Sequence, residues 1–372
     1  MDPVTQKLKV AIIGVDQHLH GFGARAHIPA ILSAPNIQLE AVCTTRVNSA
    51  RLAAERFGAK RYYTQVEDLV QDPDVDLVNV AVRVRSHYSL VWTVLKAKKM
   101  VYCEWPLGLN VLEARTLASL ARQNNLLTAI GTQGRFAPGI LYLKQLIEDG
   151  YIGRPLMFHL SHFLPRFPVR SDHWWSAMEE EYSGALGVAC AHATDTLQSI
   201  LGSITEVSGY AETLHPHDHY VDTAEPFTWT AMDAVSYQAR LGSGVTGTAH
   251  ISNLSTQQMG FRLDIFGDKG QLSATTPYYV SYSPITLKGM RSGESETELE
   301  IPAEYFLASD LEVGSAGYNI AQALLMFRQA WLSGTDFHAN FQDGYNLHRL
   351  LTAISTSWQE RRWVSIAPEG NE

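Results

Sequence analysis

The feature that most constrains the fold is a nearly continuous apolar run, Leu8 to Gly14, that leads directly into a glycine-containing loop. An apolar run of this kind is typical of a parallel strand buried on both faces. The loop carries Gly14, Gly21 and Gly23, and a helix is expected from Ala24 to Ser33. A strand, a glycine turn and a helix N-terminus together form a site where an anion such as a pyrophosphate can bind.

The alternation of strands and helices continues through the first part of the chain. It predicts a doubly wound parallel sheet of the Rossmann type, because parallel strands need crossover helices between them. We therefore expect a dinucleotide-binding domain over residues 1–134. Its further expected strands are Ile37 to Cys43, Leu77 to Val82, Met100 to Cys103 and Leu127 to Gly131. Its further expected helices are Ser49 to Phe57, a short one near Glu67, Tyr88 to Ala97 and Leu112 to Gln123.

Beyond Gly134 the pattern changes to mostly strands, after a helix that has Pro138 in its first turn and ends at Gly150. We predict an α+β domain over residues 135–372 with a large, mostly antiparallel sheet. Its uncovered face is expected to join subunits into a homodimer or homotetramer. The expected strands are Pro155 to Phe163, Glu206 to Leu214, Thr228 to Leu241, Val245 to Leu254 and Phe261 to Ala274, and the expected helices are Tyr318 to Leu332 and Tyr345 to Gln359.

Composition excludes several classes of protein. The formal net charge of −9 disfavours a nonspecific nucleic-acid binder, which needs a surplus of Lys and Arg. Cys43, Cys103 and Cys190 are too widely spaced for a disulfide framework or a zinc site, and this indicates a reducing compartment. Met1 to Lys9 has no signal-peptide core, and no apolar run approaches the roughly 18 residues of a membrane span. We expect a cytoplasmic protein that acts on a small molecule, with no nucleic-acid or membrane partner.

The end of the second predicted strand bears on the choice of cofactor. An acidic residue at this place normally accepts hydrogen bonds from the adenosine ribose of NAD. This chain has Thr44, Thr45 and Arg46, and hydroxyls with a guanidinium suit the 2′-phosphate of NADP. We therefore expect NADP rather than NAD. The alternatives are that Arg46 is simply solvated and that Gly14-Val15-Asp16, which lacks the usual second glycine, is an ordinary turn.

Glu104-Trp105-Pro106 directly follows the predicted strand that ends at Cys103. At this point the chain resembles the glucose-fructose oxidoreductase, inositol dehydrogenase and rhizopine-catabolism oxidoreductase family, and the resemblance extends over almost the whole chain. The family has Glu-Lys-Pro here, which implies that Glu104 lies near the nicotinamide ribose. The family lysine assists proton transfer, so Trp105 is a departure. A second family motif, a helix with Asp, His and often Asp, is matched by His192 and Asp195 but has Val188 at its first acidic position.

Three further stretches resemble a branch of this family that includes the fungal galactose-regulon repressor, a regulator that binds a nicotinamide dinucleotide. They are Ala24 to His27, Val82 to Tyr88, and Gln133 to Arg135 with the helix that follows. Together with the strand ends, the resemblance implies a set of cofactor-binding residues. These are Gly14, Val15, Ala24, Thr44, Thr45, Arg46, Val82, Arg83, His87, Glu104, Trp105 and Gln133.

The tryptophan at position 105 changes the expected chemistry. Reducing a carbonyl requires a hydride on carbon and a proton on oxygen, and a positioned acid contributes roughly 100- to 10,000-fold. Trp105 cannot supply that proton, so we interpret it as an apolar wall or a stacking surface. His192 is the first replacement donor, because the resemblance places it toward the nicotinamide and histidine titrates near neutrality. Asp195, one helical turn along, could orient it, and Tyr182 is the next candidate. The alternative is that His192 fills the domain interface.

Two other groups of residues invite a functional interpretation. His173-Trp174-Trp175 could line the substrate pocket. His215-Pro216-His217-Asp218-His219 is interpreted as a solvated loop, and no metal is expected.

Two hypotheses follow from the whole sequence. The first is an NADP-dependent oxidoreductase acting on a carbonyl, a sugar-like ring or an imine. The alternative is a catalytically silent, dinucleotide-binding regulator. Retention of His192 and Asp195 favours turnover, whereas Trp105 and Val188 favour its loss.

Overall fold

The computed structural model describes residues 6–15, 21–282 and 284–366. The chain divides into two compact units, one of residues 1–133 with 306–346 and one of residues 134–305 with 347–372. The sequence analysis placed 306–346 in the second domain, but these residues pack with the first unit. The reason is helix α8 (Tyr318–Ser333), which packs on α1 (Ile28–Ser33) and buries Leu324 and Phe327.

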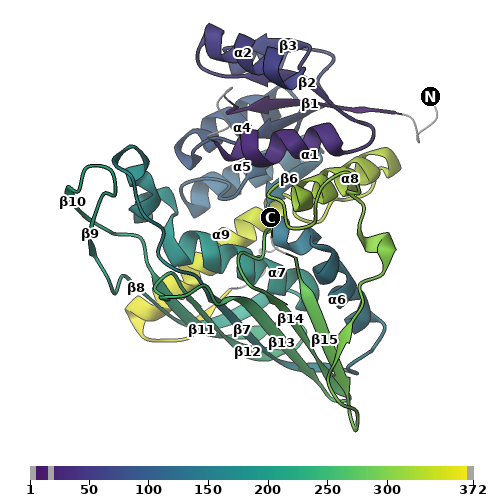
Figure 1. Cartoon of the computed structure of the whole chain (residues 1–372), viewed down its shortest axis with the longest axis vertical. Helices are drawn as coiled ribbons and strands as arrows, with labels where there is room; N and C mark the ends of the chain where they lie inside the picture. Colours follow the sequence, from purple (N-terminus) through teal and green to yellow (C-terminus); the bar gives the residue numbers. More distant parts are fainter. Residues whose placement is uncertain (1–5, 16–20, 283, 367–372) are drawn as a thin grey trace. The chain divides into compact units, whose positions relative to one another are not determined.

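The first unit contains a parallel six-stranded sheet in the order β3-β2-β1-β4-β5-β6. Strands β1, β2, β3 and β6 of this sheet are labelled in Figure 1. The order reverses between β1 and β4, which is the switch point of a doubly wound sheet. This confirms the predicted Rossmann architecture. The strands are β1 (Leu8–Ile13), β2 (Ile37–Cys43), β3 (Arg61–Tyr63), β4 (Leu77–Val80), β5 (Met100–Glu104) and β6 (Thr128–Gly131).

Capping side chains and glycines determine where several helices of the first unit begin and end. The side chain of Asn110 caps α5 by accepting from the Glu113 N–H at 2.9 Å. Helix α2 ends at Gly58, whose φ of +74° is a left-handed conformation that glycine adopts without strain. The expected helix from Ala24 is a π-helical turn, η1 (Gly23–His27), that continues into α1. The other helices are α2 (Val47–Phe57), α3 (Val66–Leu69), η2 (Val84–Ser86), α4 (His87–Lys96) and α5 (Val111–Gln123).

The second unit contains a nine-stranded sheet in the order β16-β15-β14-β13-β7-β12-β11-β8-β17. All neighbours are antiparallel except β7 and β12, which run parallel, so the predicted mostly antiparallel sheet is confirmed. Alternate residues of β11 are buried, as expected for a sheet with one covered face. The strands are β7 (Pro155–Phe163), β8 (Ile204–Glu212), β11 (Ala234–Leu241), β12 (Thr246–Ser252), β13 (Gly260–Gly267), β14 (Gly270–Thr276), β15 (Thr286–Arg291), β16 (Thr297–Leu299) and β17 (Val364–Ser365).

The helical elements of the second unit include two that span the division between the units. Helix α9 runs from Phe341 to Glu360, and a 3-10 turn, η3, covers Gln133–Phe136. A second π-helical turn precedes α7 and continues directly into it. The remaining helical elements are α6 (Pro138–Glu148), η4 (Ser171–Ala177), η5 (Glu179–Glu181), η6 (Ala185–Cys190), α7 (Ala191–Leu201) and η7 (Ala303–Tyr305).

The segment expected as one strand from Thr228 to Leu241 is interrupted. Its first part, β10 (Pro226–Thr228), pairs with β9 (His217–His219) in a separate two-stranded sheet, and β11 begins only at Ala234. The interruption has a physical cause at Asp233, which is fully buried. Its carboxylate accepts from the Leu214 N–H at 2.8 Å and pairs with Arg166, so the residue directly before β11 is committed to partners outside the strand ladder.

Candidate functional site

The turn after β1 has room only for glycine. Gly14 has a φ of +98°, and a Cβ there would lie 2.4 Å from the Ala81 carbonyl oxygen. A Cβ on Gly23, the first residue of η1, would lie 3.0 Å from the Gly14 carbonyl oxygen. The backbone therefore passes close to the end of β4, and the N-terminus of η1 follows, as a pyrophosphate site requires. Val15 and Ala24 are buried beside this turn, and Asp16 lies outside the described residues.

The end of β2 presents an exposed cation. Thr44 closes a local turn, because its hydroxyl donates to the Arg46 carbonyl oxygen at 3.1 Å and accepts from the Arg46 N–H at 3.4 Å. Thr45 and Arg46 are exposed beside it. At the end of β2, burial raises the pKa of the Cys43 thiol to about 11, and the charges of Glu67 and Asp68 add to the rise. The Cys43 thiol is therefore protonated at neutral pH.

Glu104, at the carboxyl end of β5, is the centre of a buried hydrogen-bond network. Its Oε1 lies 2.8 Å from Nε2 of His27 and accepts from Nε2 of Gln133 at 2.7 Å. The other ring nitrogen of His27 lies 2.7 Å from Nδ2 of Asn79. His27, Asn79 and Gln133 are buried, and His27 has no exposed surface. The sequence analysis identified Glu104 and Gln133 but gave no role to His27 or Asn79.

His87 links two loops from inside the first unit. Its ring nitrogens lie 2.7 Å from the Pro106 carbonyl oxygen and 2.9 Å from the Val82 carbonyl oxygen. The ring is almost fully buried, and burial lowers the pKa of His87 below its usual value. These contacts make His87 a residue that positions the loops after β4 and β5. Trp105 precedes a cis peptide bond to Pro106 and is buried, whereas Arg83 is exposed.

In the second unit, His192 lies in the first turn of α7 and is 8% exposed. Its Nδ1 lies 2.9 Å from the hydroxyl oxygen of Ser281, which the sequence analysis did not identify. The edge of the ring meets Tyr279, with centroids 5.6 Å apart. Tyr279 also stacks on Tyr282 at 5.5 Å. Nearby, burial lowers the pKa of His162 to about 4, so this second histidine is neutral at neutral pH.

Asp195, three residues after His192, is bound by Arg135. The guanidinium contacts both carboxylate oxygens, Nε donating at 2.8 Å. Asp195 is almost fully buried, so the ion pair neutralises a charge that would be costly to leave alone. The sequence analysis proposed that Asp195 orients His192, and the structure adds Arg135 as a partner that spacing could not reveal.

Tyr182 adopts a left-handed backbone conformation with a φ of +56°. Its ring meets the edge of His348 at a centroid distance of 4.7 Å. Burial raises the pKa of Tyr182 to about 12, with an opposing contribution from its hydrogen bond to Thr352. Its hydroxyl therefore stays protonated at neutral pH.

The two remaining candidate clusters are on the surface. His173 and Trp174 are exposed, and His173 meets the edge of Trp175 at 6.1 Å. His217 and His219 are exposed on strand β9 rather than in a loop, so they share one strand face. Within residues 6–15, 21–282 and 284–366, no group of three or more metal-ligating side chains is arranged to hold a metal ion. No helix in the same part of the chain is both long and apolar enough to traverse a bilayer.

A doubly wound parallel sheet with a glycine-only turn after its first strand is typical of a dinucleotide-binding domain. Two regions of the chain match known families. Residues 8–132 match the oxidoreductase family with an NAD-binding Rossmann fold, and residues 140–273 match the GFO/IDH/MocA C-terminal domain. The chain therefore belongs to the GFO/IDH/MocA family and is an NAD(P)-dependent oxidoreductase, as the sequence analysis predicted.

Three proteins are similar to this chain in sequence or in structure. Dehydrogenase aclE of Aspergillus oryzae is 27% identical over 381 residues, which cover 97% of this chain and 99% of that protein. Levoglucosan dehydrogenase in complex with NADH has a TM-score of 0.83 at 21% identity, covering 97% of this chain and all of that one. A super-repressor mutant of Gal80p from Saccharomyces cerevisiae has a TM-score of 0.85 at 18% identity, covering 97% and 98%. The last two likenesses show the fold alone.

Proposed function

We propose that this protein is an NADP-dependent oxidoreductase that transfers a hydride between the nicotinamide and a carbonyl, a sugar-like ring or an imine. The cofactor supplies or accepts the hydride, and His192 gives or takes the proton at the substrate. The observation that carries the proposal is the buried bond between His192 Nδ1 and Ser281 at 2.9 Å. A hydroxyl on one ring nitrogen restricts the orientation of an imidazole and can either donate to it or accept from it, which suits a proton-transfer group.

The proposed cofactor site lies along the carboxyl edge of the first unit's sheet. Glu104 and Gln133 would bind the nicotinamide half, and Trp105 would provide an apolar surface beside it. The proposed adenosine and phosphate contacts are Gly14, Val15, Ala24, Thr44, Thr45, Arg46, Val82 and Arg83. We propose that His87 acts through the two loops that it holds.

The preference for NADP is tested by Arg46→Ala. Removing the guanidinium should weaken NADPH binding by roughly tenfold and leave NADH binding unchanged, because only NADPH carries the 2′-phosphate. Isothermal titration calorimetry with both cofactors measures this. Arg51→Ala is a matched control, since Arg51 on α2 pairs with Glu55 at 2.7 Å and should not affect either affinity. Equal affinities of the wild-type protein for NADPH and NADH would refute the preference.

Proton transfer is tested by His192→Ala. The chemical step with a ketone substrate should slow by roughly 100-fold or more, whereas NADPH affinity should change little because the first unit supplies the proposed cofactor contacts. Ser281→Ala should cause a smaller loss. His219→Ala is the control, because His219 is an exposed histidine of β9 and lies outside the nine-stranded sheet. Full activity of His192→Ala on a carbonyl substrate would overturn the assignment and make Tyr182 the next candidate donor.

The nature of the substrate is tested by comparing a ketone with a cyclic imine. An imine that is already protonated in solution needs no donor, so His192→Ala should be only mildly impaired with it. In that case we propose that Trp105 and Tyr182 each act through the shape of the side chain and not through proton transfer.

The second candidate function is a regulator that binds the cofactor without turnover, and the specific observation that favours it is Trp105 at the position of the family lysine. Tight NADPH binding with no consumption by any sugar, ketone or imine would support it. We also propose that the uncovered face of the second unit's sheet forms a homodimer or homotetramer. A monomer in light scattering at micromolar concentration would contradict the oligomer.

A further inference from the structure

A network of buried, hydrogen-bonded side chains lies at the carboxyl edge of the Rossmann sheet and joins elements far apart in the sequence. It passes from Asn79 on β4 through His27 on η1 to Glu104 on β5, and Gln133 joins it at Glu104. His27 is fully buried, and the edge of its ring meets Tyr102 at 5.4 Å. Burial makes a polar partner for each ring nitrogen favourable, and the partners of His27 tie it to two different strands of the sheet.

The direction of the hydrogen bonds follows from the groups involved. A carboxylate only accepts, so Nε2 of His27 donates to Oε1 of Glu104. The amide nitrogen of Gln133 donates to the same oxygen at 2.7 Å. Oε1 is therefore occupied by two donors. Among the described residues, Oε2 of Glu104 has no hydrogen-bond partner, and it remains able to accept.

The position of the carboxylate is also restricted from its other side. A Cβ on Gly131 would lie only 2.5 Å from Oε1 of Glu104 and 2.8 Å from its carboxyl carbon. Glycine at this position gives the carboxylate the space to reach His27. Packing and two donors together hold the carboxyl group in one orientation.

We propose that His27 is a positioning residue that couples the two halves of the dinucleotide site. Helix η1 starts at the glycine turn of the first mononucleotide half, whereas Glu104 lies in the second half, built on β4 to β6. His27 holds Oε1, so that Oε2 is presented to the ribose hydroxyls of the nicotinamide half. This inference rests on the dinucleotide-binding class of the protein and not on the proposed NADP preference or on His192.

The test compares complete dinucleotides with fragments that lack the nicotinamide half. His27→Phe keeps an aromatic ring against Tyr102 but removes the donor. Affinities for NADH and ADP, and for NADPH and 2′,5′-ADP, are measured by calorimetry, and thermal unfolding is followed in parallel. We expect roughly tenfold weaker binding of both dinucleotides and unchanged binding of both fragments. His27→Gln, whose amide can donate, should recover most of the loss.

Two variants keep the proposal testable if His27→Phe does not fold. Gly131→Ala should displace the Glu104 carboxylate and produce the same selective loss without touching His27. Glu104→Gln should also weaken only the dinucleotides, and adding His27→Phe to it should cause little further loss. If His27→Phe and Gly131→Ala weakened the binding of dinucleotides and fragments equally, the hydrogen-bond network would only support the fold. Unchanged dinucleotide affinity in these variants would also overturn the proposal.

Discussion

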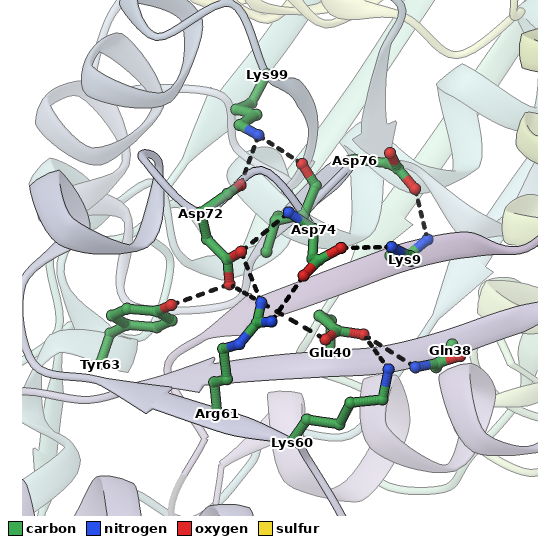
Figure 2. Close-up of polar contacts among 11 residues, drawn as sticks. Lys9, Gln38, Glu40, Lys60, Arg61, Tyr63, Asp72, Asp74, Asp76 and Lys99 are labelled. Atoms are coloured by element: carbon green, nitrogen blue, oxygen red, sulfur yellow. Dashed lines mark hydrogen bonds and ion pairs between the residues drawn. The ribbon is translucent and has the colours of Figure 1, made fainter.

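The two edges of the six-stranded sheet in the first unit differ in how far their polar side chains are paired with one another. At the amino-terminal edge, charged side chains bind one another (Figure 2). Arg61 donates to both carboxylate oxygens of Asp72 at 2.6 and 2.7 Å and to Asp74 at 2.7 Å. Lys9 donates to Asp74 at 2.7 Å. The same network includes Gln38, Glu40, Lys60, Tyr63, Asp76 and Lys99.

At the carboxyl edge, some polar side chains have atoms that form no hydrogen bond or ion pair with the described residues. Glu104 is held through one oxygen only. The guanidinium of Arg46 is exposed and forms no ion pair with any described residue. Ligands of doubly wound sheets bind at this edge. At the amino-terminal edge, the charged side chains are paired with one another and support the structure. At the carboxyl edge, polar side chains keep hydrogen-bonding atoms for a ligand.

The largest expected effect is at the carboxyl edge, in Gly14→Ala. A Cβ would lie 2.4 Å from the Ala81 oxygen at a φ of +98°, so the turn must distort. We expect the free energy of unfolding to fall by about 3 kcal/mol and NADH affinity to fall at least roughly tenfold. Gly58→Ala is the control, because its φ is +74° but no atom lies within 4 Å. That control should lose about 1 kcal/mol and keep its affinity. Chemical denaturation and calorimetry measure both quantities.

An intermediate effect is expected at the amino-terminal edge, in Arg61→Met. The variant keeps the aliphatic part of the side chain but leaves the buried carboxylate of Asp72 without its main partner. Because Arg61 itself is 40% exposed, the loss of unfolding free energy should be about 2 kcal/mol, below the value for a fully buried pair. NADH affinity should not change. Arg51→Met, which breaks only an exposed pair on α2, should cost less than about 0.5 kcal/mol. A loss of affinity in Arg61→Met would break the distinction between the two edges.

The smallest expected effect is on the pH dependence of stability, in Asp74→Asn. Hydrogen bonds from Lys9 and then Arg61 hold the pKa of Asp74 at about 2, whereas an unfolded aspartate has a pKa of about 3.9. The unfolded chain therefore binds more protons between these values, and the stabilisation present above about pH 4 is lost as the pH falls toward about 2. Asp74→Asn lacks this contribution. Its urea midpoint should lie below that of the wild type by a constant amount from pH 7 to 5, and the gap should narrow by pH 3. A gap that widened in acid would contradict the assignment.

Elements with a strong local signal were predicted well from the sequence. Strands β2 and β7 have the predicted bounds, because apolar or alternating runs with clear breakers mark both of their ends. Short or polar strands were missed. The three-residue strands β3, β9 and β16 carry too few residues for any periodicity, and pairing with neighbours creates them.

The same reason separates the candidate site residues that the sequence can suggest from those that it cannot. Glu104, Gln133 and His192 stand in motifs that can be recognised in the sequence, so they were identified before the structure. Their partners could not be, because a hydrogen bond joins residues that the topology brings together. His27 lies 77 positions from Glu104, and Ser281 lies 89 positions from His192.

By itself, the sequence determined the main alternation of strands and helices in the first unit, the glycine turn and the class of cofactor-binding fold, since each depends on residues a few positions apart. Only the tertiary structure decided that residues 306–346 pack with the first unit, that Arg135 neutralises Asp195, and that His27 holds one oxygen of Glu104. Periodicity and turn chemistry act along the chain, whereas the partners of buried polar groups are selected by strand order and packing between distant segments.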